Sequence, residues 1–397
     1  IKIHAKLLKT KLIVFYRRES ASENTKSVVE VLDTLVRVDC HDKEFASSID
    51  ADLLFSIFFE EAKSAASKLS SSVRGQVLKL CGSMAELYPE LNSVSKFSGD
   101  LCDLYLSTLK HQTSPNGKNE KQIITGALKG LASLLTQFTN ACEEGSEKAA
   151  LIFKYAKAAF SDLLAEDKLT RYDIPKAGLK LIAQHGGQFR QLLVNDVGYL
   201  WGAITTACRH KNQDVRMEAY KALETFVGEV CGEIAEGRRS KKERQDLYVK
   251  VLGYILEGNS EVGVDAVSIK AMAHMAKPMA LLAGQAELSK YFLTMLKKGN
   301  DLFSRPDSED MGRHVPSQLW CYSRCIAELD QIPDTTMPFL EHAFIFCFQV
   351  YANMSADAKD RLHTALPSFL AALYAKRAAL KSLLRNTLTS VLVLCIS

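Results

Sequence analysis

Lysine and arginine gather in three clusters, and these are the residues of the chain whose types and spacing could do chemistry. The members are Lys6, Lys9, Lys11, Arg17 and Arg18 in the first cluster, Arg209 and Lys211 with His210 and Arg216 in the second, and Arg238, Arg239, Lys241 and Lys242 with Arg244 in the third. Such cations bind the phosphates of a nucleic acid without reading its bases. We therefore treat the three clusters as candidate DNA-binding surfaces.

Simpler interpretations of the clusters stay open, because spacing alone does not separate them. A run of charge is most often a solvated face of a protein. The third cluster lies in the stretch RRSKKER, residues 238–244. That stretch is also typical of a nuclear-import signal or of the start of a soluble helix.

No pattern in the sequence indicates catalysis or a metal site. His111, His185 and His274 have no carboxylate or cysteine at triad or ligand spacing, so we interpret them as core or surface positions. The ten cysteines include no Cys-x-x-Cys pair and are typical of reduced, buried side chains in an intracellular protein. Cys321 and Cys325 share a helical face but lack a full ligand set. We predict no catalytic residue and no metal ligand.

Composition indicates which elements position the clusters. The chain has 397 residues, of which 47% are hydrophobic, and a single core rarely grows beyond about 300 residues. Prolines number only nine, and the alternating runs of strands are scarce, so an all-helical array is favoured. A net charge of +4 permits a nucleic-acid partner without requiring one. The apolar run at residues 388–396 is too short to span a bilayer, and we expect no membrane partner.

The stretch from Trp201 to Val230 contains the clearest helical pattern. Its apolar residues recur at three- and four-residue steps and include Val215, Ala219, Ala222, Leu223 and Phe226. This spacing places one apolar stripe on one helix face, which must be buried. Asn212 and Asp214 stand where a helix start needs side-chain acceptors. The small alanines let a second helix approach closely, which predicts stacked helix pairs.

The sequence Asp214-Val215-Arg216, followed by Ala219 and Ala222-Leu223, resembles the second helix of a HEAT repeat. Similar helix-turn-helix units recur about every 40 residues along the chain, which is the spacing of HEAT-type arrays. We therefore predict an all-α fold, a HEAT-type α-solenoid, which is a superhelix of antiparallel helix pairs. The longest break in this pattern predicts an array over residues 1–298, a flexible loop at 299–315, and a continuation over 316–397. We expect this chain to be a fragment of a longer one.

A second resemblance is carried by residues 126–160 and 171–189. The matching features are Leu128-Lys129-Gly130-Leu131, Phe138-Thr139, Glu143-Glu144, Arg171-Tyr172 with Pro175, and Ala177-Gly178-Leu179. Their order and spacing resemble the N-terminal helical arm of the DNA-dependent members of the phosphatidylinositol-3-kinase-like kinase family. Similarity continues toward both ends and is weakest between Lys297 and Pro316.

This resemblance implies a nuclear protein of double-strand break repair by non-homologous end joining. In that family the arm contacts double-stranded DNA ends, the Ku heterodimer and other parts of the same large chain. The resemblance favours the first basic cluster, since basic residues follow a Phe-Tyr pair at the matching place. ATP and Mg are expected only for the Ser/Thr kinase domain, which these residues do not include.

The sequence holds no Gly-rich phosphate loop, His-Arg-Asp or Asp-Phe-Gly motif, so we expect a fragment with no enzyme activity and no cofactor. An alternative stays open. The array could instead be a protein-binding scaffold of another pathway, such as a transport receptor or a phosphatase scaffold.

Overall fold

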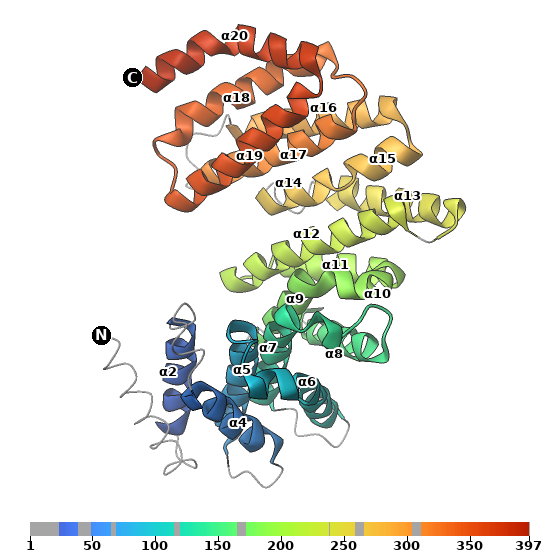
Figure 1. The fold of residues 1–397 in the computed structure, drawn as a ribbon. Helices are drawn as coiled ribbons and strands as arrows, with labels where there is room; N and C mark the ends of the chain where they lie inside the picture. The colour runs from blue at the N-terminus through green and yellow to red at the C-terminus, as the bar shows by residue number, and fades with distance from the viewer. Residues whose placement is uncertain are drawn as a thin grey trace. The chain divides into compact units, whose positions relative to one another are not determined.

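The computed structural model describes residues 24–38, 49–64, 69–114, 120–164, 172–237, 239–258, 266–303 and 311–396. Every secondary-structure element within these ranges is a helix (Figure 1). This confirms the predicted all-α class and its repeated helix pairs. The chain divides into two compact units, residues 1–222 and 223–397.

Helices of the first unit alternate between two layers. One layer contains α2 (Asn24–Val38), α5 (Ser71–Leu87), α7 (Lys121–Gln137) and α9 (Asp173–His185). The other contains α4 (Ile49–Lys63), α6 (Asn92–Thr113), α8 (Glu147–Leu164) and α11 (Val197–Cys208), with the short α10 (Arg190–Asn195) before α11. Neighbours within each layer pack side by side, as stacked repeats do. The 3-10 turns η2 (Thr139–Ala141) and η3 (Gly186–Phe189) connect helices.

The second unit begins inside α12 (Gln213–Glu236) and repeats the arrangement. One layer contains α14 (Ala266–Ala273), α17 (Met311–Glu328) and α19 (Ala356–Tyr374). The other contains α16 (Gln285–Phe303), α18 (Met337–Tyr351) and α20 (Arg377–Ile396). Helices α13 (Lys241–Gly258) and α15 (Ala276–Leu282) complete the described elements, with η4 (Asp334–Thr336) before α18.

Side-chain caps explain where several helices begin. Ser70 accepts a hydrogen bond from the Val73 backbone at the start of α5, at 3.4 Å. Asn212 Oδ1 accepts one from the Val215 backbone at 3.2 Å, which confirms the acceptor predicted there. Such caps satisfy amide groups that the first turn of a helix leaves without partners. At the other end of α5, Pro89 follows the C-cap and prevents the helix from continuing.

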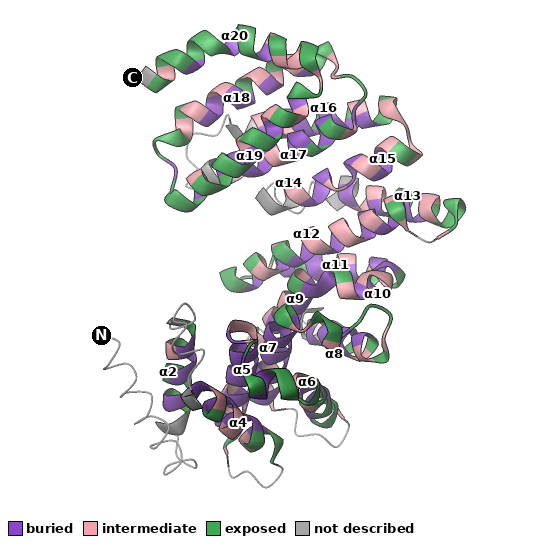
Figure 2. Ribbon diagram, in the orientation of Figure 1, coloured by how far each residue is buried: buried purple, intermediate pink, exposed green. Residues whose placement is uncertain are grey.

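The predicted apolar stripe lies in the core. Val215, Ala219, Ala222, Leu223 and Phe226 are all buried along α12. Buried residues form continuous bands along the packed helices, and exposed residues lie on their outer faces (Figure 2). Ala219 and Ala222 contribute only small side chains to this buried face.

Two segments each contain two short helices. Residues 190–208 are divided at Asp196 into α10 and α11, and residues 266–282 are divided between α14 and α15. One sequence prediction differs from the structure. The predicted loop at 299–315 overlaps helices at both ends, because α16 extends to Phe303 and α17 starts at Met311. The intervening residues 304–310 lie outside the described part, and their flexibility stays a prediction.

Helix α20 is the one described helix that is long and apolar enough to cross a membrane, judged by length and composition over Arg377–Cys395. Only 17% of that stretch is buried. The helix packs against α18 and α19 on one side, which leaves Leu388, Leu392 and Val393 exposed on the other. Because an outer helix of an array has one packed face, this composition is weak evidence for a membrane span.

Candidate phosphate-binding surfaces

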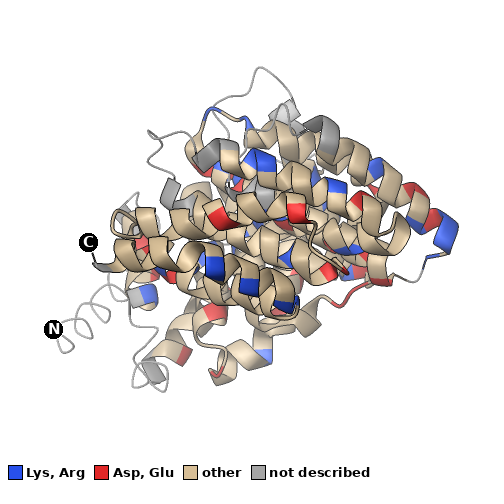
Figure 3. Cartoon of the chain, turned by 90° about the horizontal axis from the view of Figure 1, so that it is seen from above, with Lys and Arg blue, Asp and Glu red and all other residues tan. Residues whose placement is uncertain are grey.

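The first basic cluster, Lys6, Lys9, Lys11, Arg17 and Arg18, lies outside the described residues, and so does Arg238 of the third cluster. The second and third clusters belong to different compact units. Lysine and arginine are interspersed with acidic residues over the helices (Figure 3). Each described member of a cluster therefore has its own charged and hydrogen-bonding surroundings.

The second cluster lies in the turn between α11 and α12. Arg216 donates from Nη1 to the backbone carbonyls of His210 and Lys211, at 2.7 and 2.8 Å. This arginine holds the turn together and has a structural role. The side chains of Arg209 and Lys211 are exposed. Lys211 contributes its backbone carbonyl, and not its side chain, to the contact with Arg216. Its exposed ammonium group is therefore better placed to bind a phosphate than the guanidinium group of Arg216.

The third cluster divides in the same way. Arg244 donates to the carbonyls of Ile234 and Ala235, at 3.3 and 3.4 Å, and so satisfies the end of α12. Arg239 lies 3.7 Å from the buried carboxylate of Glu233. The side chains of Lys241 and Lys242 are exposed in the first turn of α13. Only these two lysines, among the described members, present a charge that is directed to solvent.

Ser240 and Glu243 give the third cluster its helix-start character. Ser240 Oγ accepts from the Glu243 backbone at 3.3 Å, and Glu243 Oε2 accepts from the Ser240 backbone at 2.9 Å. This reciprocal pair is a capping box. The interpretation of RRSKKER as the start of a soluble helix is thus confirmed for the described residues. The import-signal interpretation stays a prediction.

A fourth basic site, which the sequence analysis missed, depends on the close crossing of α5 and α7. Gly75 and Gly126 face each other where the two helices cross. A Cβ atom on Gly126 would lie 2.7 Å from the carbonyl carbon and the Cα of Gly75, which no real Cβ contact allows. Gly130 packs against Tyr105, whose hydroxyl group donates to the Leu78 carbonyl at 2.8 Å. Glycine at these positions lets the two backbones touch.

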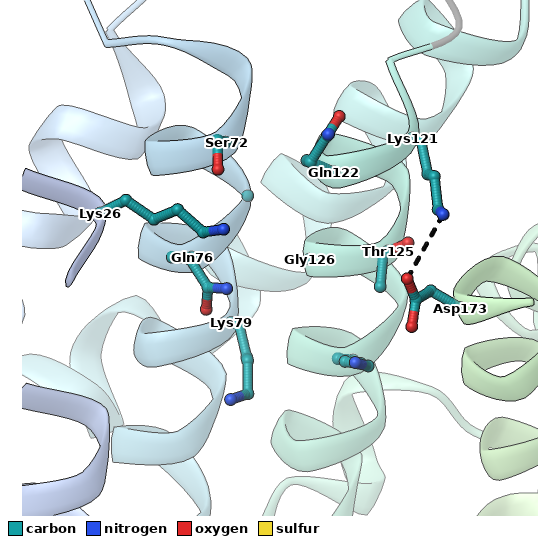
Figure 4. A pocket seen from close by; sticks show the side chains of 11 residues that line it. Lys26, Ser72, Gln76, Lys79, Lys121, Gln122, Thr125, Gly126 and Asp173 are labelled. Carbon is teal, nitrogen blue, oxygen red and sulfur yellow. Dashed lines mark ion pairs between the residues drawn. The ribbon is translucent and has the colours of Figure 1, made fainter. Parts of the chain in front are cut away.

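A pocket of about 300 Å³ lies over this crossing. Its lining residues are Lys26, Ser72, Gly75, Gln76, Lys79, Lys121, Gln122, Thr125, Gly126, Lys129 and Asp173. Lys26 and Lys79 extend from one side of the pocket, and Lys121 and Asp173 lie on the other (Figure 4). The four lysines come from three different helices, α2, α5 and α7.

Three of the four pocket lysines have a carboxylate partner. Lys79 Nζ lies 2.7 Å from Asp33 Oδ2, and Lys121 Nζ lies 3.4 Å from Asp173 Oδ2. Lys26 Nζ lies 3.8 Å from Glu30 Oε1. Lys129 has no ion-pair partner within the described ranges. Burial lowers the pKa of Lys129, and although Asp173 opposes this shift, the charges of Lys79, Lys176 and Lys180 add to it. An anion in the pocket would relieve this repulsion.

The histidines and cysteines have structural surroundings. His185 is buried, and its Nε2 lies 2.7 Å from the Ala132 carbonyl. Cys321 and Cys325 are buried free thiols, and burial raises the pKa of Cys325 to about 12. A protonated thiol is a poor metal ligand. Within the described ranges, no group of three or more His, Cys, Asp or Glu side chains is arranged to hold a metal ion.

The described elements and surfaces define an all-helical repeat array whose sequence has no kinase motif. The family described as "DNA-PKcs, N-terminal" matches residues 1–397, and the chain belongs to this family. It is 28% identical to the DNA-dependent protein kinase catalytic subunit of Mus musculus over 296 residues, which are 74% of this chain and 7% of that protein. The chain therefore corresponds to the N-terminal region and not to the kinase domain.

Relatives from Xenopus laevis and Dictyostelium discoideum extend this match. The catalytic subunit of Xenopus laevis is 25% identical over 392 residues, which are 97% of this chain and 9% of that protein. That of Dictyostelium discoideum is 23% identical and is matched by 83% of this chain and 8% of its own length. The chain thus spans less than a tenth of the length of these relatives, and their whole activity is not carried over to it.

The structure explains the residue types in two of the motifs on which the family resemblance rests. In Leu128-Lys129-Gly130-Leu131, both leucines are buried, Gly130 lies at the helix crossing, and Lys129 lines the pocket. In Arg171-Tyr172 with Pro175, Tyr172 is the N-cap of α9 and Pro175 lies in its first turn, where a missing amide hydrogen does no harm. Arg171 itself lies outside the described residues.

Proposed function

We propose that this chain is the non-catalytic helical arm of a DNA-end-joining Ser/Thr protein kinase, and that it contacts duplex DNA ends through their phosphates. The observation that carries the proposal is the family match over all 397 residues. The relatives are named as catalytic subunits of a DNA-dependent protein kinase. ATP and Mg would be bound by a kinase domain elsewhere in such a protein.

Exposed cations at helix ends supply the chemistry for this contact. Lys211 stands in the turn between α11 and α12, and Lys241 and Lys242 stand at the start of α13. A protein that accepts any DNA end needs charge and not base readout, and lysines on turns provide it. Arg239 of the third cluster is less available to bind a phosphate, because the carboxylate of Glu233 already compensates its charge.

Charge reversal tests this assignment. We expect Lys211→Glu, and separately Lys241→Glu with Lys242→Glu, to lower the affinity of the full chain for a blunt duplex. Each lost phosphate contact reduces the dependence of log K on log salt by about one. Lys297→Glu is the matched control, since Lys297 is an exposed lysine in the middle of α16. Equal affinities of all variants and the wild type would contradict the proposal.

We also propose the Ku heterodimer as a protein partner, other parts of the same large chain as further partners, and the nucleus as the location. These follow from membership in the family and from the double-strand break repair that it implies. The test is the affinity of the full chain for Ku already bound to a duplex, compared with the duplex alone. Tighter binding in the presence of Ku supports the proposal, and equal binding contradicts it. An alternative role as a scaffold for acidic peptides would instead show peptide binding without any preference for DNA.

A further inference from the structure

We propose that the pocket over the crossing of α5 and α7 binds a compact polyphosphate, which is a small molecule carrying two or more phosphate groups. The pocket is lined by four lysines and one aspartate. The proposal concerns a site distinct from the exposed turns of the second and third clusters. It does not depend on whether those turns bind DNA.

Uncompensated positive charge is the first argument. Lys129 is half-buried and has no ion-pair partner among the described residues. The charge of Asp173 favours its ammonium form, whereas burial and the charges of Lys79, Lys176 and Lys180 disfavour it. Removing an ammonium group from water is unfavourable unless an anion or hydrogen-bond acceptors replace the lost hydration. A phosphate group between Lys129 and Lys79 would supply both, with strong charge-assisted hydrogen bonds.

The helix directions add to this charge. Helices α5, α7 and α9 begin at Ser71, Lys121 and Asp173, and each contributes a lining residue from its first turn, namely Ser72, Gln122 and Asp173 itself. The amino ends of helices carry partial positive charge and free amide groups. The first turns of three helices and four lysine side chains therefore line the same pocket, together with the carboxylate of Asp173.

An unpartnered hydroxyl group also faces this region. Thr125 lines the pocket, and its Oγ1 is buried without a hydrogen-bond partner among the described residues. Buried hydroxyl groups are nearly always hydrogen-bonded, and leaving one unpaired is unfavourable. The side chains of Gln76 and Gln122 carry further amide donors and line opposite sides of the pocket (Figure 4), and Gln76 Nε2 also donates to Glu30 Oε1 at 3.1 Å. A phosphate oxygen would satisfy Thr125 and accept from these amides.

Size favours a compact ligand over a duplex backbone. The volume of about 300 Å³ is at the lower end of the range for small-molecule sites. The lysines approach from opposite walls, so they surround one small volume (Figure 4). Duplex phosphates are instead distributed along an extended axis. Several phosphates on one small scaffold match this arrangement of charge.

The test is calorimetric titration of the full chain with tripolyphosphate, and in a second arm with ATP, at low salt. Lys129→Met keeps the apolar stem of the side chain and removes its charge, and we expect it to weaken binding by about tenfold or more. Thr125→Val is nearly isosteric, and we expect it to weaken binding by about threefold to tenfold while leaving the melting temperature unchanged or higher. Lys180→Met is the control, because Lys180 is a nearby half-buried lysine that does not line the pocket.

Binding that falls in both pocket variants and persists in the control supports the proposal. Three results would overturn the proposal. The first is absence of tripolyphosphate binding by the wild type, and the second is an equal loss in Lys180→Met, which would indicate diffuse electrostatic attraction. A third would be displacement of tripolyphosphate by a short duplex at equal phosphate concentration, since the pocket would then be a contact for the DNA backbone. Melting temperatures of the free variants separate loss of binding from loss of folding.

Discussion

Gly126 of α7 lies against Gly75 of α5, and this contact between two helix backbones sets the distance between the first-unit helices that carry the lysine pocket. A Cβ atom at Gly126 would meet the carbonyl carbon of Gly75 at 2.7 Å. The obstacle is backbone, which cannot rotate away as a side chain can. The pocket and the crossing beneath it are therefore structurally coupled.

Gly126→Ala is predicted to lower the free energy of unfolding by about 1–3 kcal/mol or more, because overpacking must push α5 and α7 apart. Urea unfolding measures this change. Gly99→Ala in α6 is the control, since nothing lies within 4 Å of a Cβ at that position. Alanine there should stabilise the chain by about 0.4–1 kcal/mol through helix propensity. If Gly126→Ala were as harmless as Gly99→Ala, the described crossing would be wrong.

The second cluster should separate into a structural and a functional residue. Arg216→Ala removes two hydrogen bonds to carbonyl groups in the turn before α12, and we expect a loss of about 1–2 kcal/mol of stability. Lys211→Ala should leave the free energy of unfolding within about 0.5 kcal/mol of the wild type and weaken duplex binding. Urea unfolding and duplex titration of both variants make the comparison. Reduced stability of Lys211→Ala would assign that lysine a structural role instead.

Asp33 of α2 pairs with Lys79 of α5, and this ion pair is expected to make the free energy of unfolding depend on pH in the acid range. Burial raises the pKa of Asp33, but the hydrogen bond and charge of Lys79, with Ser83 and Arg37, lower it overall. The folded pKa is thus below the unfolded one, so the stabilisation is present above the ordinary value of 3.8 and is lost as pH falls through the lowered pKa. Asp33→Asn should cost about 1–3 kcal/mol at neutral pH and progressively less in acid. A cost that stays constant down to strongly acidic pH would refute this.

Protonation of His274 is expected to lower the free energy of unfolding over a higher pH range than protonation of Asp33. Burial lowers its pKa to about 4, and the positive charges of Arg324 and Lys270 add to the shift. Because the folded pKa is depressed, stability is complete above the ordinary value of 6.5 and falls as pH drops toward 4, by at most about 3 kcal/mol. His274→Phe keeps a ring against Trp320, whose centroid lies 5.5 Å away, and should flatten this pH profile. An unchanged profile in the variant would show that another group titrates.

Most of the architecture could be predicted from the sequence, because apolar periodicity and caps are local signals. Helices recur along the described residues as expected, and the stripe from Val215 to Phe226 is buried. The extent of α17 was not predicted. A proline is common in the first turn of a helix, so the sequence favours a helix start at Pro316. In the structure α17 begins at Met311, and Pro316 lies inside the helix.

The lysine pocket could not be predicted, because its residues are distant in sequence. Lys26, Lys79, Lys121 and Lys129 are single lysines on three helices, and only the stacking of those helices brings them together. The one available signal was Gly126 and Gly130, spaced by four on one helix face, which is typical of close helix packing. For the basic clusters, the sequence predicts more phosphate ligands than the structure supports. Arg216 and Arg244 were candidates, but both donate hydrogen bonds to backbone carbonyl groups near helix ends.

Binding of the full chain to blunt duplexes of two unrelated sequences across a salt series tests the central claim most directly, namely that this arm holds DNA by its phosphates. We predict similar affinities for the two sequences and a linear fall of log K with log salt, with a slope of about −0.9 for each phosphate contacted. A strong preference for one sequence, or an affinity that does not change with salt, would contradict the claim.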